Sequence, residues 1–365
     1  MSTIIRILLL SFALLTFLVQ CEKEEEKPET IPDFNFLCAL IERGIDTNRD
    51  SIIDASEAET VKYLDVSSMG IRDMTGIELF VSLVYLDCSN NQVRVLDLTH
   101  NKALERLISQ DGILGIIDAT DLTNLKQLDC EQNQMGTLLV NGCSSLERLI
   151  CRKNNIRELD VSSNSQLVEL NCGSNQLTTL DVSNNHALEW LMCSSNQLTS
   201  LDVSNQAELS DLYCGSNQYT TLDISNNTKL ERIQCPDGQL TSLDVSDNSA
   251  LTELRCDLNL LTTLDVSNNL ALEVLSCYYN QLTSLDVTNN NALHYLFCSR
   301  NQLTNLDISN NTRLGSGYPD YTSLYIDYMP DLYEVCVWTM PFPPEDLIIS
   351  REGSPNVYFT TECIQ

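Results

Sequence analysis

The chain has 365 residues, of which 43% are hydrophobic and only 6% aromatic, so its core must be built mainly from aliphatic side chains. Its formal net charge of −30 at pH 7 repels nucleic acid and anionic lipid headgroups, which excludes both from the expected partners. Such a surface favours cations, basic proteins or neutral glycans, although keeping the protein soluble is a sufficient reason for the charge.

An export signal is expected at the N-terminus, over residues 1–20. Arg6 supplies a short basic region, and the apolar stretch at 7–19 is too short to span a membrane comfortably. Residues 18–21 read Leu-Val-Gln-Cys and resemble the lipobox of bacterial lipoproteins, with glutamine where a small residue is usual. The resemblance implies that Cys21 is lipidated and becomes the mature N-terminus. The alternative is ordinary secretory cleavage, which would release the protein.

Residues 21–33 are expected to form a spacer that carries the lipid anchor. Positions 22–29 read Glu-Lys-Glu-Glu-Glu-Lys-Pro-Glu, a composition that stays solvated because it has almost no apolar surface to bury. The segment resembles the acidic tether that marks lipoproteins for the outer cell face in Bacteroidetes-like bacteria. That resemblance implies an outer-membrane lipoprotein exposed on the cell surface, and a plain linker is the alternative.

Residues 34–62 carry the one explicit chemical site of the sequence. Side-chain oxygens stand at positions 1, 3, 5, 9 and 12 of a loop, and a main-chain carbonyl stands at position 7. Hard oxygen ligands at this spacing wrap one cation, and the pattern resembles the EF-hand and dockerin-type calcium loops. The resemblance implies one bound Ca²⁺ with the ligands Asp46, Asn48, Asp50, Ile52, Asp54 and Glu57.

The flanking sequence fits a helix–loop–helix. Asp33 can cap a first helix that ends at Gly44, and a second helix is expected from Ala55 to Lys62. Glycine normally permits the sharp turn at the position of Ser51, so we expect a modest calcium affinity. We predict that calcium orders this unit so that it covers the first coil of the following repeats. An aspartate-rich surface turn without a cation is the alternative.

An internal repeat occupies most of the chain. Residues 83–313 divide into eleven units of 21 residues without an insertion, preceded by a divergent unit at 61–82. A shortened unit is expected at 314–331, and a terminal repeat with a C-terminal cap at 332–365. A typical unit, 188–208, follows the pattern Leu-x-x-Leu-x-Cys-x-x-Asn-x-Leu. This pattern resembles the leucine-rich repeats of internalin-like bacterial proteins.

The resemblance implies a right-handed leucine-rich-repeat solenoid, β-rich within the α/β class, with a parallel β-sheet on its concave face and a short helical N-terminal cap. The residues support such a fold independently. Positions 1, 4, 6, 11, 14 and 16 of each unit are apolar, and one isolated coil cannot bury them all. Stacking the coils about 4.8 Å apart through parallel strands creates a continuous core over residues 61–331.

Two polar columns follow from the repeat. Asparagine at position 9 both donates and accepts, so we expect it to satisfy backbone groups of adjacent turns. Aspartate at position 15 is expected to accept hydrogen bonds from serine, threonine or backbone donors of its own turn. A ladder of bound cations along this edge is the alternative for the aspartates.

The 15 cysteines fall into separate classes. Ten share position 6 and point inward one coil apart, which is looser than the roughly 3.8 Å between β-carbons of a disulfide. We therefore expect packed thiols rather than disulfides or a metal array. Cys336 and Cys363 flank two expected strands of the C-terminal cap and are expected to form a disulfide, whereas Cys38 and Cys143 have no predicted partner. The ten are Cys88, Cys130, Cys151, Cys172, Cys193, Cys214, Cys235, Cys256, Cys277 and Cys298.

The strand positions that face outward differ from unit to unit, while the core positions stay fixed. One stretch gathers aromatic and arginine residues, which are enriched at binding hot spots, and aromatic faces also stack on sugars. Ordinary packing between neighbouring strands is the alternative. The predicted ligand-binding residues are Trp190, Tyr213, Arg232, Arg255, Tyr278, Tyr279, Tyr295, Phe297 and Arg300.

The expected function is binding rather than catalysis. The three histidines, His100, His186 and His294, lie in separate units, and no nucleophile–base arrangement or catalytic metal motif accompanies them. The first hypothesis is a surface adhesion module that binds a protein on another cell or a host. Capture of a glycan in a nutrient-uptake system is the alternative, and a passive envelope protein is a third possibility.

Overall fold

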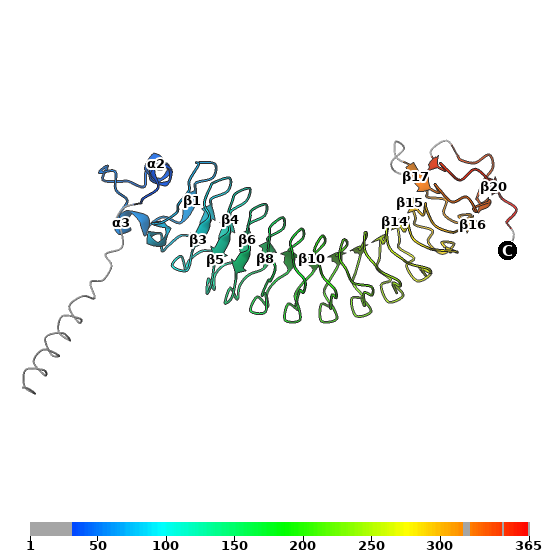
Figure 1. Cartoon of the computed structure of the whole chain (residues 1–365), viewed down its shortest axis with the longest axis horizontal. Coiled ribbons are helices and arrows are strands. Elements are labelled where there is room, and N and C mark those ends of the chain that lie inside the picture. Colours follow the sequence, from blue (N-terminus) through cyan, green and yellow to red (C-terminus); the bar gives the residue numbers. More distant parts are fainter. Residues whose placement is uncertain (1–30, 317–321, 345–346, 364–365) are drawn as a thin grey trace, which may run out of the picture.

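The computed structural model describes residues 31–316, 322–344 and 347–363. They form a curved rod of stacked coils with a helical unit at one end (Figure 1). The expected export signal, Cys21 and most of the expected spacer lie outside these residues. Within the described ranges, no helix is both long and apolar enough to cross a membrane.

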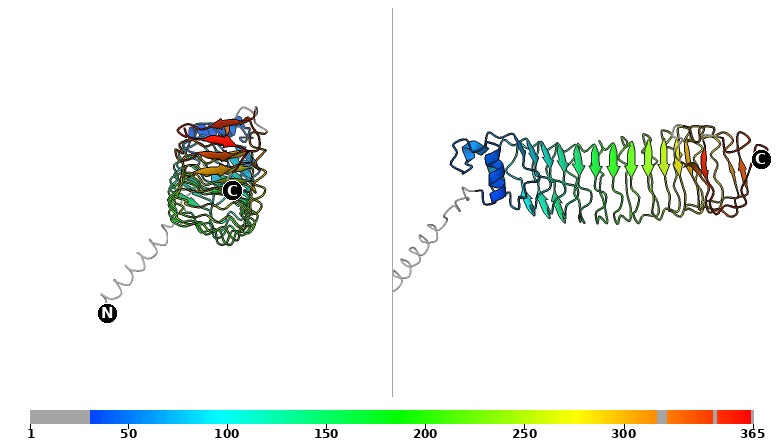
Figure 2. Two further views of the ribbon diagram at one scale, coloured as in Figure 1. Left: turned by 90° about the vertical axis from the view of Figure 1, so that its right-hand side faces the viewer. Right: turned by 90° about the horizontal axis from the view of Figure 1, so that it is seen from above.

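A parallel sheet of 14 strands runs along the concave side of the described coils (Figures 1 and 2). Each regular strand pairs with the same position of the next coil, so that Leu191 lies opposite Leu212, one repeat further along the chain. This register confirms the predicted repeat length and the solenoid of stacked coils. The strands are β1 (Tyr63–Asp65), β2 (Tyr85–Asp87), β4 (Arg106–Ile108), β6 (Gln127–Asp129), β8 (Arg148–Ile150), β9 (Glu169–Asn171), β10 (Trp190–Met192), β11 (Asp211–Tyr213), β12 (Arg232–Gln234), β13 (Glu253–Arg255), β14 (Val274–Ser276), β15 (Tyr295–Phe297), β17 (Thr322–Tyr325) and β19 (Ile348–Ser350).

Two short sheets lie on a second side of the coils, one near each end of the rod. The first contains β3 (Val95–Asp97), β5 (Ile116–Asp118) and β7 (Thr137–Leu139), and the second contains β16 (Asn305–Asp307), β18 (Glu334–Cys336) and β20 (Tyr358–Thr360). Between β7 and β16, the corresponding positions form no strand, apart from an isolated bridge of Asp286 to Asp307. A second backbone ladder therefore joins the coils near the two ends of the rod but not in the middle.

The side chains at position 14 differ in exposure between the ends and the middle of the rod. They are 6–8% exposed in the seven middle coils and 0–4% exposed where a short sheet covers them. The position-14 side chains are thus slightly less covered in the middle coils, where no second strand ladder joins neighbouring turns. The middle set is Leu159, Leu180, Leu201, Leu222, Leu243, Leu264 and Leu285, and the covered set is Leu96, Ile117, Leu138 and Leu306.

The coil after residue 313 is longer than the sequence suggests. Leu296 pairs with Leu324, and Leu306 of the second sheet pairs with Val335, so both pairings span more of the chain than one regular repeat. The prediction of a shortened unit at 314–331 is therefore wrong. Leu314 resembles the first leucine of a unit, but the next strand of the main sheet, β17, begins only at Thr322.

The N-terminal unit packs on the first coil through α2 (Phe34–Glu42), which buries Phe36, Ala39 and Leu40. The Asp33 carboxylate accepts a hydrogen bond from the Phe36 N–H at 2.9 Å, as expected of an N-cap. The second helix, α3 (Ala55–Ala58), is shorter than predicted because the chain must soon enter β1. A short 3₁₀ helix, η1 (Ile77–Leu79), completes the divergent first coil.

Asparagine at position 9 binds backbone groups as predicted. Asn196 donates to the carbonyls of Cys172 and Cys193, both at 3.0 Å, and accepts from the Leu177 N–H at 3.0 Å. The neighbouring position 8 has a left-handed backbone conformation in each regular coil, with φ between 54° and 57°. Residues other than glycine are uncommon in this region, and Leu258 is the most apolar aliphatic side chain held there.

A second buried amide column at position 19 was not predicted. Asn185 donates to the carbonyls of Val161 and Asn164 at 3.0 and 2.8 Å, while its Oδ1 has no hydrogen-bond partner among the described residues. Cys143 occupies the same column and donates its Sγ–H to the Ala119 carbonyl at 3.0 Å, which explains this otherwise isolated cysteine. The amides of the column are Asn101, Asn164, Asn185, Gln206, Asn227, Asn248, Asn269, Asn290 and Asn311.

Candidate functional site

The ten position-6 cysteines are buried free thiols. Several donate to a carbonyl of the next coil, as Cys130 does to Ile150 at 3.4 Å. Burial raises the pKa of the Cys88 and Cys172 thiols to about 12, so they stay protonated and unreactive at neutral pH. Packed thiols are therefore confirmed for this column. At the C-terminal end, Cys336 and Cys363 are joined by a disulfide with 5.5 Å between their Cα atoms.

The expected calcium loop follows α2 and curls through two positive φ angles, 65° at Arg49 and 67° at Ser51. Asp46 accepts backbone N–H groups of both residues, at 2.6 and 3.0 Å. Ser51 thus has the left-handed conformation that glycine usually supplies. The side-chain oxygens and the Ile52 carbonyl are hard donors, so the chemistry of the set fits Ca²⁺.

The carboxylates of the loop are also occupied by backbone donors. The buried Glu57 accepts from the Thr47 N–H at 2.8 Å and from the Asp54 N–H at 3.3 Å, while Asp54 accepts from the Glu57 N–H at 3.0 Å as a capping box. In the described chain, one group of three His, Cys, Asp or Glu side chains has all its ligand atoms within 4.8 Å of one another. It consists of Asp307, Cys336 and Cys363 and lies outside the calcium loop. The loop carboxylates are therefore spread more widely, and a bound cation would have to draw them inward.

The Asp column at position 15 caps its own turns. Asp181 accepts from the Ser183 N–H at 2.9 Å, and Asp160 accepts from both the N–H and the hydroxyl of Ser162. These serine hydrogen bonds lower the pKa values of Asp160 and Asp181. The turn-cap interpretation of this column is confirmed.

Seven of the nine predicted ligand-binding residues fall into two aromatic groups on the concave face. The first, here called the Trp190 group, joins Trp190 and Tyr213, whose ring centres lie 5.4 Å apart. The Tyr213 hydroxyl donates to the buried Asp211 at 3.2 Å, and Arg232 forms an ion pair with the same carboxylate. The rings and charges of this group are therefore fixed by one another.

The second, here called the Phe297 group, lies at the C-terminal end of the sheet. The ring of Phe297 stacks on Tyr295 at 6.1 Å and contacts Tyr325 at 5.0 Å. The Arg300 guanidinium lies over Tyr328 at 4.2 Å and over Tyr279 at 5.5 Å. Tyr325 and Tyr328 were missed by the sequence analysis because they follow the long coil, outside the regular period.

A charged strip separates the two groups. Arg255 pairs with Glu253, which also accepts from Gln234 at 2.9 Å. Asp257 is buried beside Ser276, and this burial raises the pKa of its carboxyl group. Burial, and to a lesser degree the negative charge of the Asp257 carboxylate, raise the pKa of the Tyr278 hydroxyl. Arg255 and Tyr278 therefore belong to this strip rather than to either aromatic group.

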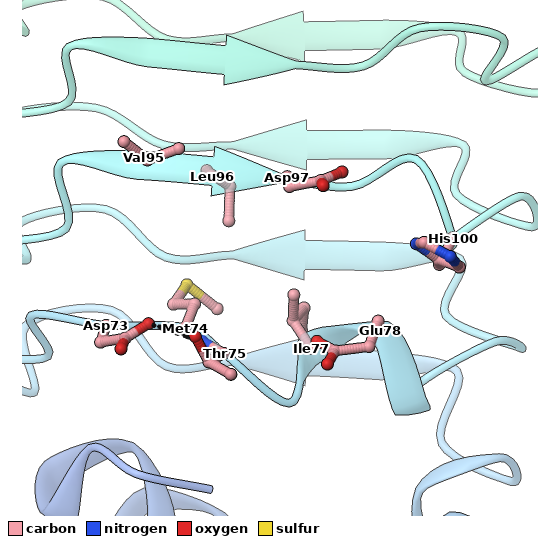
Figure 3. Close-up of a pocket in the computed structure, with 9 residues that line it drawn as sticks. All are labelled: Asp73, Met74, Thr75, Ile77, Glu78, Val95, Leu96, Asp97 and His100. Carbon is pink, nitrogen blue, oxygen red and sulfur yellow. Dashed lines mark hydrogen bonds between the residues drawn. The ribbon is translucent and has the colours of Figure 1, made fainter. Parts of the chain in front are cut away.

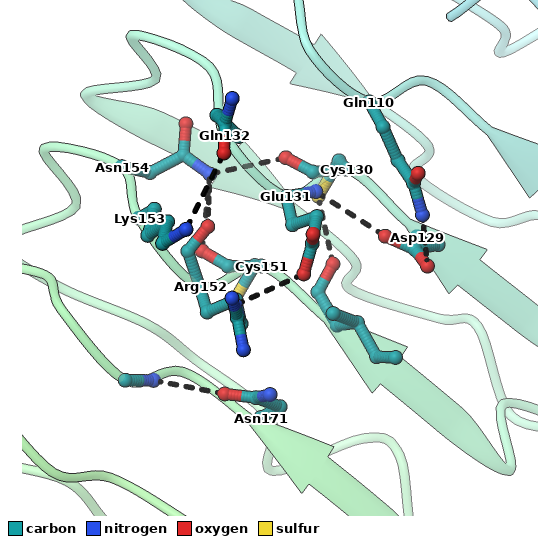
Figure 4. Close-up of polar contacts among 12 residues, drawn as sticks. Gln110, Asp129, Cys130, Glu131, Gln132, Cys151, Arg152, Lys153, Asn154 and Asn171 are labelled. Carbon is teal, nitrogen blue, oxygen red and sulfur yellow. Dashed lines mark hydrogen bonds and ion pairs between the residues drawn. The ribbon is translucent and has the colours of Figure 1, made fainter.

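Between β6 and β9 the concave face carries polar and ion pairs. Arg152 pairs with Glu131 at 3.0 Å, and Gln110 donates to Asp129 (Figure 4). Arg148 pairs with Glu169 at 2.8 Å. These pairs are partly exposed, so each contributes about 0–1 kcal/mol to stability. This part of the concave surface thus differs from the Phe297 group, where aromatic rings gather.

No family model matches the sequence, and no curated protein matches it. An internalin from Listeria monocytogenes is 19% identical over 92% of this chain and 96% of that chain, with a TM-score of 0.56. The ectodomain of the Arabidopsis thaliana receptor kinase GASSHO1/SCHENGEN3, in complex with Casparian strip integrity factor 2, is 18% identical over 83% of this chain and 47% of that chain, with a TM-score of 0.57.

The functional domain of InlJ from Listeria monocytogenes, which includes a cysteine ladder, is 29% identical over 81% of this chain and 80% of that chain. The TM-score of this pair is 0.46. The strand register, the apolar positions and the two better-superposed neighbours agree with one another. The chain therefore has the leucine-rich-repeat fold that internalins and plant receptor ectodomains share.

Proposed function

We propose that the chain is a non-enzymatic binding module whose concave face captures a protein partner. The observation that carries this proposal is the Phe297 group. Tyr279 and Tyr328 are 51% and 42% exposed even though Arg300 lies over both rings, so their contacts with one another leave ring surface available. Exposed aromatic and arginine side chains on a rigid sheet are the residues that dominate protein interfaces.

The charged strip favours a protein over a glycan. A sugar chain binds best to an uninterrupted row of rings, whereas here Glu253 and Arg255 interrupt the row. The two aromatic groups lie four strand steps apart, from β11 to β15, which is roughly 19 Å at about 4.8 Å per strand. Two apolar contacts flanking a polar strip match a folded surface with its own alternation of apolar and charged residues.

Export and lipid anchoring belong to the same proposal. The Cys21 lipid would hold the rod at an outer membrane, and the acidic spacer would carry it away from the lipid surface. The free thiols are compatible with export because they are buried. Replacement of Cys21 by Ser should move the protein from the membrane fraction to the medium.

Calcium is proposed as a structural ion of the N-terminal unit. The ligands would be Asp46, Asn48, Asp50, Asp54 and Glu57, with the carbonyl of Ile52. Calcium should raise the melting temperature of the exported part of the chain, and a chelator should lower it, because a ligand that binds only the folded state stabilises it. Glu57→Gln keeps an acceptor for the Thr47 N–H but removes a charge, so it should abolish the calcium response. Equal melting temperatures with calcium and with chelator would exclude the site.

The binding proposal is tested with the exported part of the chain, in calcium, against cell-surface proteins and a glycan array. Tyr279→Ala combined with Phe297→Ala should weaken capture of the identified partner at least tenfold. Tyr63→Ala is the matched control, because Tyr63 is an exposed tyrosine of the same sheet at the other end. Binding to glycans alone would replace the protein partner by the glycan alternative. An unchanged affinity in the double variant would exclude the Phe297 group.

A further inference from the structure

The strand β3 has an open edge. It is the first strand of its sheet, in the order β3, β5, β7, and the preceding coil supplies η1 and an irregular segment in place of a strand. The Ile116 N–H donates to the Arg94 carbonyl, and the Leu98 N–H donates to the Asp118 carbonyl. The backbone N–H and C=O groups of the even-numbered residues of β3 therefore point toward β5. Alternate residues of a parallel strand bond to opposite neighbours, so the backbone groups of Val95 and Asp97 point toward the preceding coil.

A cavity lies where the missing strand would stand. It has a volume of about 350 Å³ and is lined by residues of the first two coils (Figure 3). Leu96, Met74 and Ile77 form its buried apolar floor. Val95, at the mouth, is 60% exposed. The cavity together with the outer edge of β3 is called the β3 slot below.

The rim of the β3 slot is acidic. Asp73 accepts from the Thr75 N–H at 2.8 Å, Asp97 from the Thr99 N–H at 2.9 Å, and Glu78 from the Gly76 N–H at 2.8 Å. Each bond uses one carboxylate oxygen, and none of these acids forms an ion pair within the described ranges.

Basic side chains lie next to the rim, but none of them forms an ion pair with its acids within the described residues. Arg72 precedes Asp73 and donates to Gln92 at 3.1 Å, and Arg94 precedes Val95. His100 borders the slot and Lys102 follows in the same turn, and both lower the pKa of Asp97 after the stronger effect of Thr99. However, the Lys102 ammonium bonds to the carbonyls of Thr120 and Asp121 in the next coil. The slot therefore presents three carboxylates around an apolar floor.

We propose that the β3 slot binds an extended, lysine- or arginine-bearing segment of a partner protein by adding it as a strand to β3. The free backbone groups of Val95 and Asp97 would hydrogen-bond the segment, and the acidic rim would bind its basic side chains. The chain's own spacer fits poorly, because residues 22–29 carry five glutamates and two lysines. This surface is separate from the concave sheet, so the proposal goes beyond the function proposed above.

The first test measures binding of two acetylated ten-residue peptides, one alternating lysine with valine and one alternating glutamate with valine. The lysine peptide should bind saturably, more weakly as salt screens the rim, and the glutamate peptide should not. On binding, hydrogen exchange of the Val95 and Asp97 amides should slow at least tenfold. Saturable binding without protection of these two amides would overturn the proposal, as would equal binding of both peptides.

Two variants separate the strand edge from the charge. Val95→Pro removes an N–H that makes no bond to β5, and proline is tolerated on strand edges, so affinity should fall about fivefold while Val95→Thr has little effect. Asp97→Asn keeps the acceptor for Thr99 but loses the charge, and should also weaken binding. Asp181→Asn is the matched control, because Asp181 caps the same turn four coils away.

Two further outcomes would contradict the proposal. An equal loss in Asp97→Asn and Asp181→Asn would show that the peptide responds only to the overall charge, and would overturn the site. Self-association of the protein that Val95→Pro abolishes would assign the slot to a second copy of the chain and also contradict the proposal. Melting curves identify any variant that fails to fold, and in that case the amide protection of the unmodified protein decides.

Discussion

The Arg300 guanidinium lies 4.2 Å from the centre of the Tyr328 ring, although the two residues belong to different coils. The long coil after residue 313 brings them together, because β17 pairs with β15 across this interval. A cation over an aromatic ring at an exposed site contributes about 0.5–1 kcal/mol. The contact therefore ties the irregular C-terminal coils to the regular array.

A double-mutant cycle measures this contact. Arg300→Gln and Tyr328→Leu should together be less destabilising than the sum of the single variants, with a coupling of about 0.5–1 kcal/mol in the free energy of unfolding. The cycle cancels the loss of the hydrogen bond from Tyr328 to Glu352 and any backbone effect at either position. Additive single variants, measured by urea unfolding, would show that the ring and the guanidinium do not interact.

Leu258→Asn should stabilise the protein. Leu258 has φ of 55°, in a region that asparagine tolerates much better than leucine. The relief of backbone strain should raise the free energy of unfolding by about 0.5–1 kcal/mol. Loss of the packing of the partly buried leucine side chain reduces this gain. Leu260→Asn serves as the control, because Leu260 is exposed and has no positive φ. A gain of the same size in both variants would point to the added polar group rather than to backbone conformation.

The two amide columns should differ in their sensitivity to substitution. Asn196 binds two carbonyls and one N–H, whereas Asn185 binds two carbonyls with its Oδ1 unpaired among the described residues. Asn196→Cys should therefore cost about 1–3 kcal/mol more than Asn185→Cys, which introduces the residue that Cys143 already provides in that column. Thermal or urea unfolding of the two variants gives the comparison, and the reverse order would contradict the assignment of the columns.

The serine caps predict a pH dependence. Serine hydrogen bonds lower the pKa values of Asp160, Asp181 and Asp202. Their stabilising effect is complete above the ordinary carboxyl pKa and is lost as pH falls through the lowered values. Alanine at the paired serines, Ser162, Ser183 and Ser204, should therefore lower the melting temperature at pH 6 and have a smaller effect near pH 2.5. A loss of melting temperature that became larger toward acid pH would contradict this prediction.

Alkylation should distinguish Cys38 from the buried column. Cys38 in α2 is partly exposed, whereas the position-6 thiols are buried and Cys172 has a pKa of about 12. Iodoacetamide at pH 8 should label Cys38 first, with the column reacting only after unfolding. Peptide mass spectrometry of the native protein checks this. Early labelling of Cys172 would mean that the middle coils open more readily than their packing implies.

The sequence was sufficient to predict features that repeat. Leucine at position 4 and cysteine at position 6 recur in nearly every unit, so the coil, its inward side chains and its main sheet could be inferred from the period alone. Features that interrupt the period could not. Tyr325 and Tyr328 escaped notice because they follow a coil that is longer than the regular repeat, although aligning Leu324 with Leu296 would have placed them.

Other features depend on how neighbouring coils meet. The position-19 amides looked like ordinary turn residues, and only stacking shows that they are buried against the preceding coil. The open edge of β3 likewise arises because residues 72–80 fold as turn and 3₁₀ helix rather than as a strand. Both are properties of a pair of coils, which a single repeat does not encode.

The second ladder of strands is confined to the two ends, and this has a mechanical consequence. The middle coils are joined by one backbone ladder and by the two amide columns, whereas the coils at the ends share a second backbone ladder as well. A change in the curvature of the rod therefore has to break or lengthen more hydrogen bonds at the ends than in the middle. We expect any bending of the rod against a bound surface to be concentrated between β7 and β16.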